Sequence, residues 1–317
     1  VPIYHVVQQF LNAKYGKKEC ARTAAMMKYS VKGGILSESL DYVIKVSPHY
    51  KELLWGNLFP LNVSELGEGN SYFFKSENII GDFNWLYILV SKYQKAISEY
   101  VVMRDHIEKS ILLGSYDDAI SKLEDIKRKY GVSIWYYETK LLIYSYSGKE
   151  TKSLELLTEI NNVKQDAKQG FVTFLLSYLH KRCSKTYSAF AYDSELENKF
   201  RLNRTEFQKD RYSYYLFRLN FYKSYETQDL MPVLIMESTN SLIDRYNIFI
   251  NLIKAYFVNS EDLTGKNLAA AMAVKFYRKT NDPQLASLVV YSNTKCLSSE
   301  YFNYNYIDIL EDYYKGK

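Results

Sequence analysis

The chain has 317 residues, of which 47% are hydrophobic and 24% are charged, with 13 glycines and five prolines. This composition excludes a disordered chain, a collagen-like repeat and a turn-dense β-sandwich, and it favours helices. The formal net charge of +5 is modest for this length and gives a weak preference for anionic partners.

Residues 1–82 differ in pattern from the rest of the chain. Adjacent glycines at 33 and 34, prolines at 48 and 60, and the stretch LGEGNS at 66–71 interrupt short helical patterns. Glycine and proline are the strongest local breaks in regular structure. We therefore predict a helical N-terminal region over 1–82 and a helical repeat array over 83–317.

The stretch GSYDDAISKLEDIKRKYG at 114–131 carries the marks of a helix with a defined start and end. Ser115 precedes Asp118 by three positions, which predicts a capping box in which side chains satisfy the free amides of the first turn. Gly131 is placed to end the helix with a left-handed backbone. One apolar stripe is formed by Ala119, Ile120, Leu123, Ile126 and Tyr130.

A second helical hairpin follows. The stretch SIWYYETKLLIYSY at 133–146 has apolar residues on more than one side, which predicts a helix packed between neighbours. After it, Ser147 and Glu150 have the spacing of another capping box, and Leu154, Leu157 and Ile160 predict its apolar stripe. The glycine that opens this turn, Gly148, corresponds to Gly114 in the turn before it.

The spacing from Gly114 to Gly148 resembles the helix-turn-helix period of the tetratricopeptide repeat (TPR), which is about 34 residues. Gly114, Tyr116 and Ala119 match the opening of the second helix of that repeat, and Tyr144 matches the tyrosine late in its first helix. The resemblance covers about one and a half units, roughly 103–163. It implies an all-α fold of stacked antiparallel hairpins, a right-handed solenoid with a concave groove for peptides or partner proteins, and it implies no catalytic residue.

The repeat departs from the family pattern at several positions. Tyr137 stands where the family often has tryptophan, Lys140 and Leu141 replace a Leu-Gly pair, and Gly131 stands where a proline usually closes the unit. Beyond the repeat the motif is not kept, but helical periodicity continues. Helices are predicted at 165–182, 205–224, 229–238, 241–258, 267–279, 284–292 and 299–313.

The fold implied by this resemblance makes a non-enzymatic scaffold for a protein or peptide partner our leading hypothesis. Such a protein would be one component of a multi-protein system, for example in bacterial defence or regulation. Tyrosine and arginine suit interface anchors, because they combine a large contact area with polar tips. The predicted partner-binding residues are Tyr137, Lys140, Tyr144, Arg211, Tyr215 and Arg218.

A nucleic-acid-binding protein or regulator is the second hypothesis, and it rests on the segment 199–223. This segment contains seven basic residues and two acidic ones, and tyrosines and phenylalanines lie between them. Cations that contact phosphates and aromatic rings that stack on bases are typical of sequence-tolerant nucleic-acid binding. The competing interpretation is a helix whose aromatic residues are core, with long basic side chains lying over them.

A third alternative is a metal-dependent nuclease. Asp118, Glu138 and Lys140 resemble the Asp…Glu-x-Lys arrangement of a large nuclease family, in which carboxylates hold a divalent metal and the lysine activates water. That family places Glu-x-Lys on a strand. Because the apolar residues of 133–146 have helical spacing, a solvated charged helix face is the expected outcome.

His180 and Cys183 lie three positions apart on a predicted helix and so share a face. They form a possible thiolate–imidazole or metal pair, but a buried thiol beside a boundary histidine is the more common outcome. We predict no metal site and no cofactor. The three cysteines lack disulfide or metal spacing, and no apolar stretch reaches the length of a membrane span, so a cytoplasmic protein is expected.

Overall fold

The computed structural model describes residues 33–48, 50–66, 79–162, 170–183, 206–219, 230–259 and 263–291, with a few single residues between and before these ranges. All of the regular structure in this part of the chain is helical, which confirms the all-α prediction. The elements are α3 (Gly33–Val46), α4 (Tyr50–Trp55), η1 (Val63–Glu65), α5 (Ile79–Lys92), α6 (Gln94–Leu112), α7 (Tyr116–Tyr130), α8 (Ile134–Tyr146), α9 (Glu150–Asn162), α10 (Gly170–Cys183), α12 (Glu206–Leu219), α13 (Leu230–Glu237), α14 (Leu242–Asn259), α15 (Leu263–Thr280) and α16 (Pro283–Tyr291).

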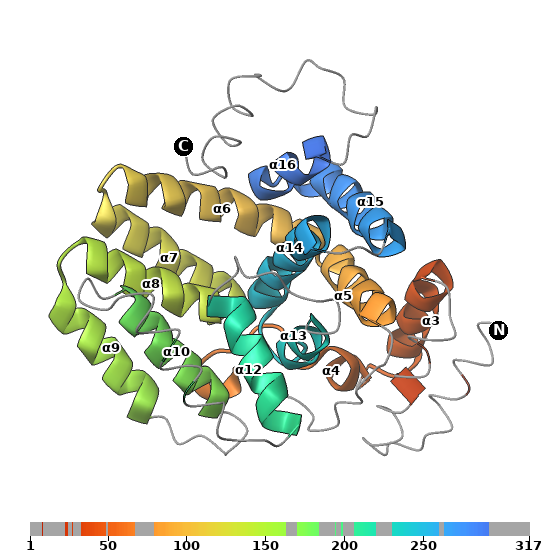
Figure 1. Ribbon diagram of the computed structural model, residues 1–317, viewed down its shortest axis with the longest axis horizontal. Helices are drawn as coiled ribbons and strands as arrows, with labels where there is room; N and C mark the ends of the chain where they lie inside the picture. Colours follow the sequence, from red (N-terminus) through yellow and green to blue (C-terminus); the bar gives the residue numbers. More distant parts are fainter. Residues whose placement is uncertain are drawn as a thin grey trace.

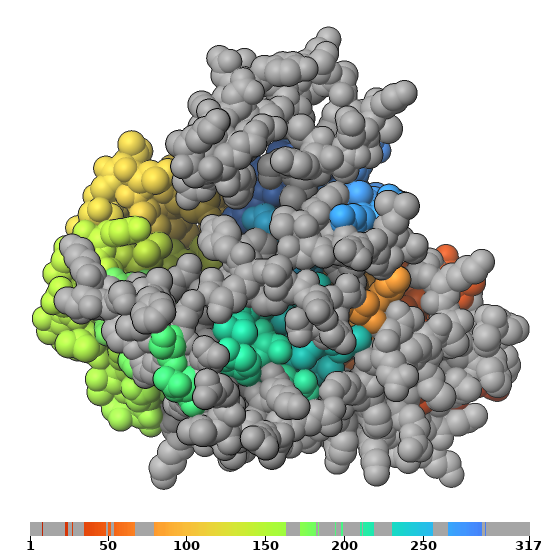
Figure 2. All heavy atoms as spheres, viewed as in Figure 1, coloured from red at the N-terminus to blue at the C-terminus, as the bar shows by residue number. Residues whose placement is uncertain are grey.

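Helices α6 to α10 form a stack of neighbouring hairpins along one flank of the molecule (Figures 1 and 2). Helix α6 packs against α7, α7 against α8, and α8 against both α9 and α10. Contact between alternate helices such as α8 and α10 is what stacked hairpins require, because each hairpin buries its apolar face on the next one. This part of the fold therefore consists of packed helix pairs.

The period seen in the sequence is visible in the backbone itself. The amide of Ser115 donates to the carbonyl of Ser110 at 2.8 Å, and at the equivalent place in the next hairpin the amide of Lys149 donates to that of Tyr144 at 2.9 Å. These bonds close the ends of α6 and α8 in the same way. Both turns contain a glycine with a left-handed backbone, Gly114 with φ of 73° and Gly148 with φ of 68°.

The side of α9 that faces the core differs from the predicted apolar stripe. Leu154 is 57% exposed, whereas Ser153, Leu156 and Ile160 are buried. Ser153 occupies the place that Ala119 has one period earlier. Because leucines stand on both sides of Glu155, the sequence pattern fits either rotation, and packing against α8 and α10 selects the one observed.

The predicted capping box at Ser115 is also not formed. Ser115 makes no side-chain hydrogen bond to the first turn of α7. Asp118 instead accepts hydrogen bonds from Ser110 Oγ and Lys122 Nζ, both at 2.6 Å. The side-chain cap of this hairpin lies at the next helix, where Ser133 Oγ accepts from the amide of Tyr136 at 2.9 Å.

The C-terminal helices turn back onto the start of the array. Helix α14 packs against α5, α6, α8 and α15, and α15 packs against α5 and α6 (Figure 1). In an open solenoid each repeat contacts only its neighbours. The buried apolar side chains from α3 to α16 form one hydrophobic core, and the predicted boundary after residue 82 falls inside α5.

The backbone of the loop after α4 contacts both the hairpin stack and the C-terminal helices. The carbonyl of Leu58 accepts from the amide of Leu242 at 2.9 Å, and that of Pro60 accepts from the amide of Val132 at 2.7 Å. Gly131 has φ of 74° and ψ of −168°, a conformation open essentially to glycine alone. A Cβ atom at Gly131 would lie 2.1 Å from the carbonyl oxygen of Pro60.

Candidate functional site

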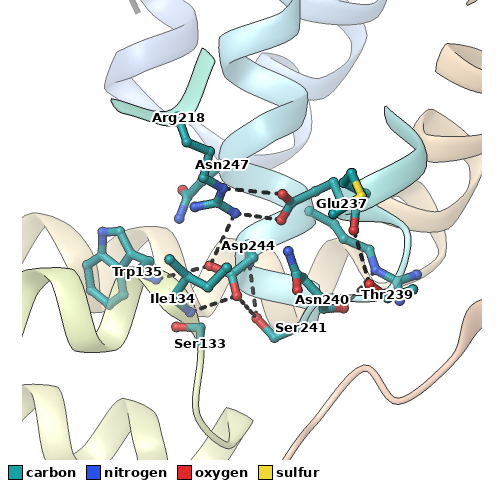
Figure 3. Close-up of polar contacts among 12 residues, drawn as sticks. Ser133, Ile134, Trp135, Arg218, Glu237, Thr239, Asn240, Ser241, Asp244 and Asn247 are labelled. Carbon is teal, nitrogen blue, oxygen red and sulfur yellow. Dashed lines mark hydrogen bonds and ion pairs between the residues drawn. The ribbon is translucent and has the colours of Figure 1, made fainter. Parts of the chain in front are cut away.

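A buried ion pair joins α12 to α13 beside α14. Arg218 Nη2 lies 2.6 Å from Glu237 Oε1, and Arg218 Nε donates to Glu237 Oε2 at 3.3 Å, so the guanidinium binds the carboxylate with two bonds (Figure 3). Tyr214 donates its hydroxyl to Glu237 at 2.9 Å. The Arg218 side chain is 8% exposed and that of Glu237 is 1% exposed. Burial raises the pKa of Glu237, because desolvation outweighs the attraction of Arg218.

Asp244 of α14 caps the amino end of α8. Its carboxylate accepts from the amides of Ile134 at 2.8 Å and Trp135 at 3.0 Å, and from Ser241 Oγ at 2.8 Å (Figure 3). Free amides and the positive end of the helix dipole both favour a carboxylate there. Arg218 Nη2 lies 3.7 Å from Asp244, so one guanidinium lies between two buried carboxylates.

Arg245 is the second buried cation of this network. Its Nε donates to the carbonyl of Asn240 at 2.8 Å, and burial lowers its pKa to about 10, which leaves it charged at neutral pH. Gly56 lies beside it with φ of 65°, and a Cβ there would be 3.3 Å from Arg245 Nη2. The two arginines balance the two carboxylates and fix α8, α12, α13 and α14 together.

A second charge network fastens α6 to α14 and α16. Arg104 Nη2 lies 2.6 Å from Asp282 Oδ1, and both side chains are buried. Asp282 also accepts a hydrogen bond from the Tyr246 hydroxyl and one from the amide of Gln284 at 2.8 Å, so it caps the start of α16. Because these charges are covered by protein, a substrate cannot reach them in this conformation, and their role here is positional.

The structure places the three predicted residues of α8 differently. Tyr137 is 8% exposed and belongs to the core, and its role in recognition stays a prediction. Lys140 Nζ forms an ion pair with Glu124 Oε1 at 2.7 Å and is held further by a hydrogen bond to the Tyr136 hydroxyl at 2.8 Å. Tyr144 is partly buried and packs against the core.

On α12, two of the predicted partner-binding residues, Tyr215 and Arg218, are buried in the interior. Tyr215 is 1% exposed, with its ring centre 5.0 Å from that of Phe174, and Arg218 is bound to Glu237 as described. The side chain of Arg211 lies outside the described residues. Within the described part of 199–223, Tyr214 and Phe217 are also buried, which corrects the interpretation of these rings as a base-stacking surface.

The nuclease alternative fails on local geometry. Residues 134–146, which include Glu138 and Lys140, form helix α8 and not a strand. Asp118 is bound to Ser110 and Lys122 on the surface of α7. Among the described residues, no group of three or more histidines, cysteines, aspartates or glutamates could hold a metal ion.

His180 interacts with the repeat. Its Nδ1 lies 3.0 Å from Ser153 Oγ on α9, and the carbonyl of Cys183 accepts from Ser145 Oγ of α8 at 2.5 Å. This end of α10 is thus fastened to both helices of the preceding hairpin. The pair therefore has a packing role in this conformation.

Acidification is expected to loosen this contact slightly. Burial lowers the pKa of His180 from its ordinary value of 6.5. The unfolded chain therefore binds a proton at a higher pH than the folded chain does, so stability falls as the pH drops through 6.5. In thermal melts from pH 7.5 to 5.5, His180→Gln should show a smaller decrease in Tm than the wild type; an unchanged decrease would contradict this.

No protein family, curated protein or solved structure matches the chain. No helix among the described residues is both long enough and apolar enough to cross a membrane.

Of the charged members of both networks, sequence reasoning singles out only Arg218, and as a partner-binding residue, although one signal points to the others. The run TNSLIDRYNIFINLI at 239–253 contains no charge except Asp244 and Arg245. Charged residues that interrupt a helix with apolar residues on every side have to be paired, because an unpaired buried charge is too costly. The pairing partners themselves come from distant segments, and no spacing reveals them.

Proposed function

We propose that the chain is a non-enzymatic scaffold that binds a protein or peptide partner through a TPR-like array, as one component of a multi-protein system. The supporting observation is a set of large apolar side chains at the turns of successive hairpins. Leu112 and Leu113 in the α6–α7 turn are 86% and 81% exposed, and Tyr146, one repeat period after Leu112, is 56% exposed.

These turns lie next to each other at one end of the stack (Figure 1). Lys149, which follows the α8–α9 turn, forms an ion pair with Asp117 in the first turn of α7 at 2.6 Å. The three exposed side chains therefore form one edge of the array, which we call the turn edge: Leu112, Leu113 and Tyr146. Covering a leucine of this kind is worth roughly 1.5–3 kcal/mol, so a partner that covers the turn edge gains binding energy.

The buried charge networks support a rigid scaffold. Buried ion pairs connect α6 with α16 and α12 with α13, and the Asp244 carboxylate of α14 holds the amino end of α8. A rigid array holds the turn edge in one arrangement, which lowers the entropy cost of binding. The cysteine composition fits a reducing compartment, and we place this function in the cytoplasm.

Replacement of the turn edge by serine tests the proposal. The triple variant Leu112→Ser, Leu113→Ser and Tyr146→Ser should keep the wild-type Tm within a few degrees, because these side chains are exposed. The immobilised wild-type chain should retain a defined set of proteins from nuclease-treated native extract. The triple variant should retain at least about tenfold less of these proteins, which corresponds to about 1.4 kcal/mol or more of binding free energy.

Leu61→Ser provides the matched control, because Leu61 is 76% exposed but lies in the loop after α4. This variant should retain the same proteins as the wild type. Equal retention by the wild type and the triple variant would overturn the turn edge as the binding surface. An absence of any specifically retained protein, with the chain folded, would overturn the scaffold function itself.

A further inference from the structure

The amino end of α6 meets the carboxyl ends of α7 and α15, and basic residues gather where they meet. On α6, Lys95, Ser98 and Glu99 have the spacing i, i+3 and i+4, so they share one side of the helix. Lys129 Nζ of α7 lies 2.7 Å from Glu99 Oε2. Towards α15, Ser98 Oγ donates to the carbonyl of Lys279 at 3.1 Å.

These contacts define a surface that we call the basic end. It contains five exposed cations and two carboxylates, Glu99 and Asp125, which gives a formal charge of 5 − 2 = +3. The Asp125 carboxylate binds Arg128, and that of Glu99 binds Lys129. The five cations are Lys95, Arg128, Lys129, Arg278 and Lys279.

An aromatic residue lies beside this surface. Phe59, which is 37% exposed, packs edge-on against Tyr93, the residue that precedes α6, with 5.9 Å between ring centres. The next residue, Pro60, accepts a hydrogen bond from Val132 just after α7. The loop therefore contacts the residue before α6 and the residue soon after α7, the two helix ends that carry Lys95 and Lys129.

Ordinary helix electrostatics explains only part of this cluster. Cations in the last turns of α7 and α15 stabilise the negative ends of those helix dipoles. Lys95 is different, because it lies in the first turn of α6, where a cation is repelled by the positive end of the helix dipole. Lys95 attracts the Glu99 carboxylate four positions further on, but Glu99 also binds Lys129, so one carboxylate serves two lysines.

We propose that the basic end binds nucleic acid through its phosphate backbone. The cations come from the ends of three helices and so form an extended set, which suits the regularly repeated charges of a phosphodiester chain. The Phe59 ring offers a stacking surface for an unpaired base. An acidic peptide is less well matched, because it offers carboxylates but no base that could stack on the Phe59 ring.

The test is fluorescence anisotropy with the full chain and two probes, a labelled single strand of about 30 nucleotides and the duplex of the same sequence. The charge-reversal variant Lys95→Glu with Lys279→Glu should weaken binding by at least about tenfold. It should also reduce the salt slope by about two, one for each lysine that no longer meets a phosphate. Tighter binding of the single strand than of the duplex assigns the source to unpaired nucleic acid, and the reverse assigns it to duplex.

The matched control is Lys109→Glu with Lys152→Glu, at or near the opposite end of the hairpins. Each pair lowers the formal net charge by four, from +5 to +1. The control should change affinity by less than about twofold at the same ionic strength. Lys95→Gln with Lys279→Gln provides a milder variant if charge reversal lowers the Tm.

Three results would overturn the proposal. The first is an equal loss of affinity in both variants, which would show a response to net charge alone. The second is no saturable binding by the wild type at about 50 mM salt, where phosphate contacts are strongest. The third is competition by polyglutamate at the same charge concentration as the nucleic acid, which would assign the basic end to an acidic polypeptide.

Discussion

Replacing Gly131 with alanine should lower the free energy of unfolding by about 2–4 kcal/mol. The backbone of Gly131 has φ of 74° and ψ of −168°, which a residue with a Cβ atom adopts only under strain. The added Cβ would also lie 2.1 Å from the backbone oxygen of Pro60, and a backbone atom cannot move aside as a flexible side chain does. Denaturant unfolding followed by circular dichroism measures the loss.

Gly114→Ala is the control for a positive φ at a glycine that no other backbone segment approaches. Gly114 has φ of 73°, but a Cβ there would meet no atom within 4 Å. Its substitution should cost only about 1 kcal/mol, the strain of a left-handed residue. Equal losses for the two variants would show that the approach of the loop to Gly131 contributes nothing.

Replacing Arg218 with alanine should cost about 3–5 kcal/mol near neutral pH, because it leaves the Glu237 carboxylate buried without its cation. The loss should be smaller near pH 5. Burial already raises the pKa of Glu237, and without Arg218 the folded state binds a proton even more tightly than the unfolded chain does. Stability then decreases as the pH rises through the pKa of the folded state. Unfolding curves at the two pH values measure both effects.

Two further variants separate the buried pair from surface charge. Arg128→Ala removes an ion pair whose arginine side chain is 79% exposed, and it should cost less than about 1 kcal/mol. The double variant Arg218→Met with Glu237→Leu removes both charges and should recover most of the lost stability. Failure of the double variant to recover stability would show that the ion pair contributes beyond mutual neutralisation.

The local part of the fold could be predicted from the sequence. Helices α7, α8 and α9 were located by helical periodicity and by Gly114, Gly131 and Gly148, because these signals act within a few residues along the chain. The same holds for α10, α12, α13, α14, α15 and α16. The predicted helix at 299–313 lies outside the described residues.

The relations between distant segments could not be predicted. The rotation of α9 depends on which of its leucines packs against α8 and α10, and both choices satisfy the same periodicity. Tyr137 and Tyr215 were assigned to a surface because tyrosine suits both interfaces and interiors, and only the packed neighbours decide between them. The pairing of Arg104 with Asp282 spans 178 positions, which no motif spacing describes.

The cap that Asp244 places on α8 can form only late in the synthesis of the chain. The amides of Ile134 and Trp135 find their acceptor about 110 residues further along the chain. A growing chain that has released α8 from the ribosome therefore holds a helix whose amino end, apart from Ser133, still depends on water. At about 5–20 residues per second, this state lasts for roughly 5–20 seconds before Asp244 emerges. During that interval the nascent chain presents an unfinished hairpin stack to chaperones.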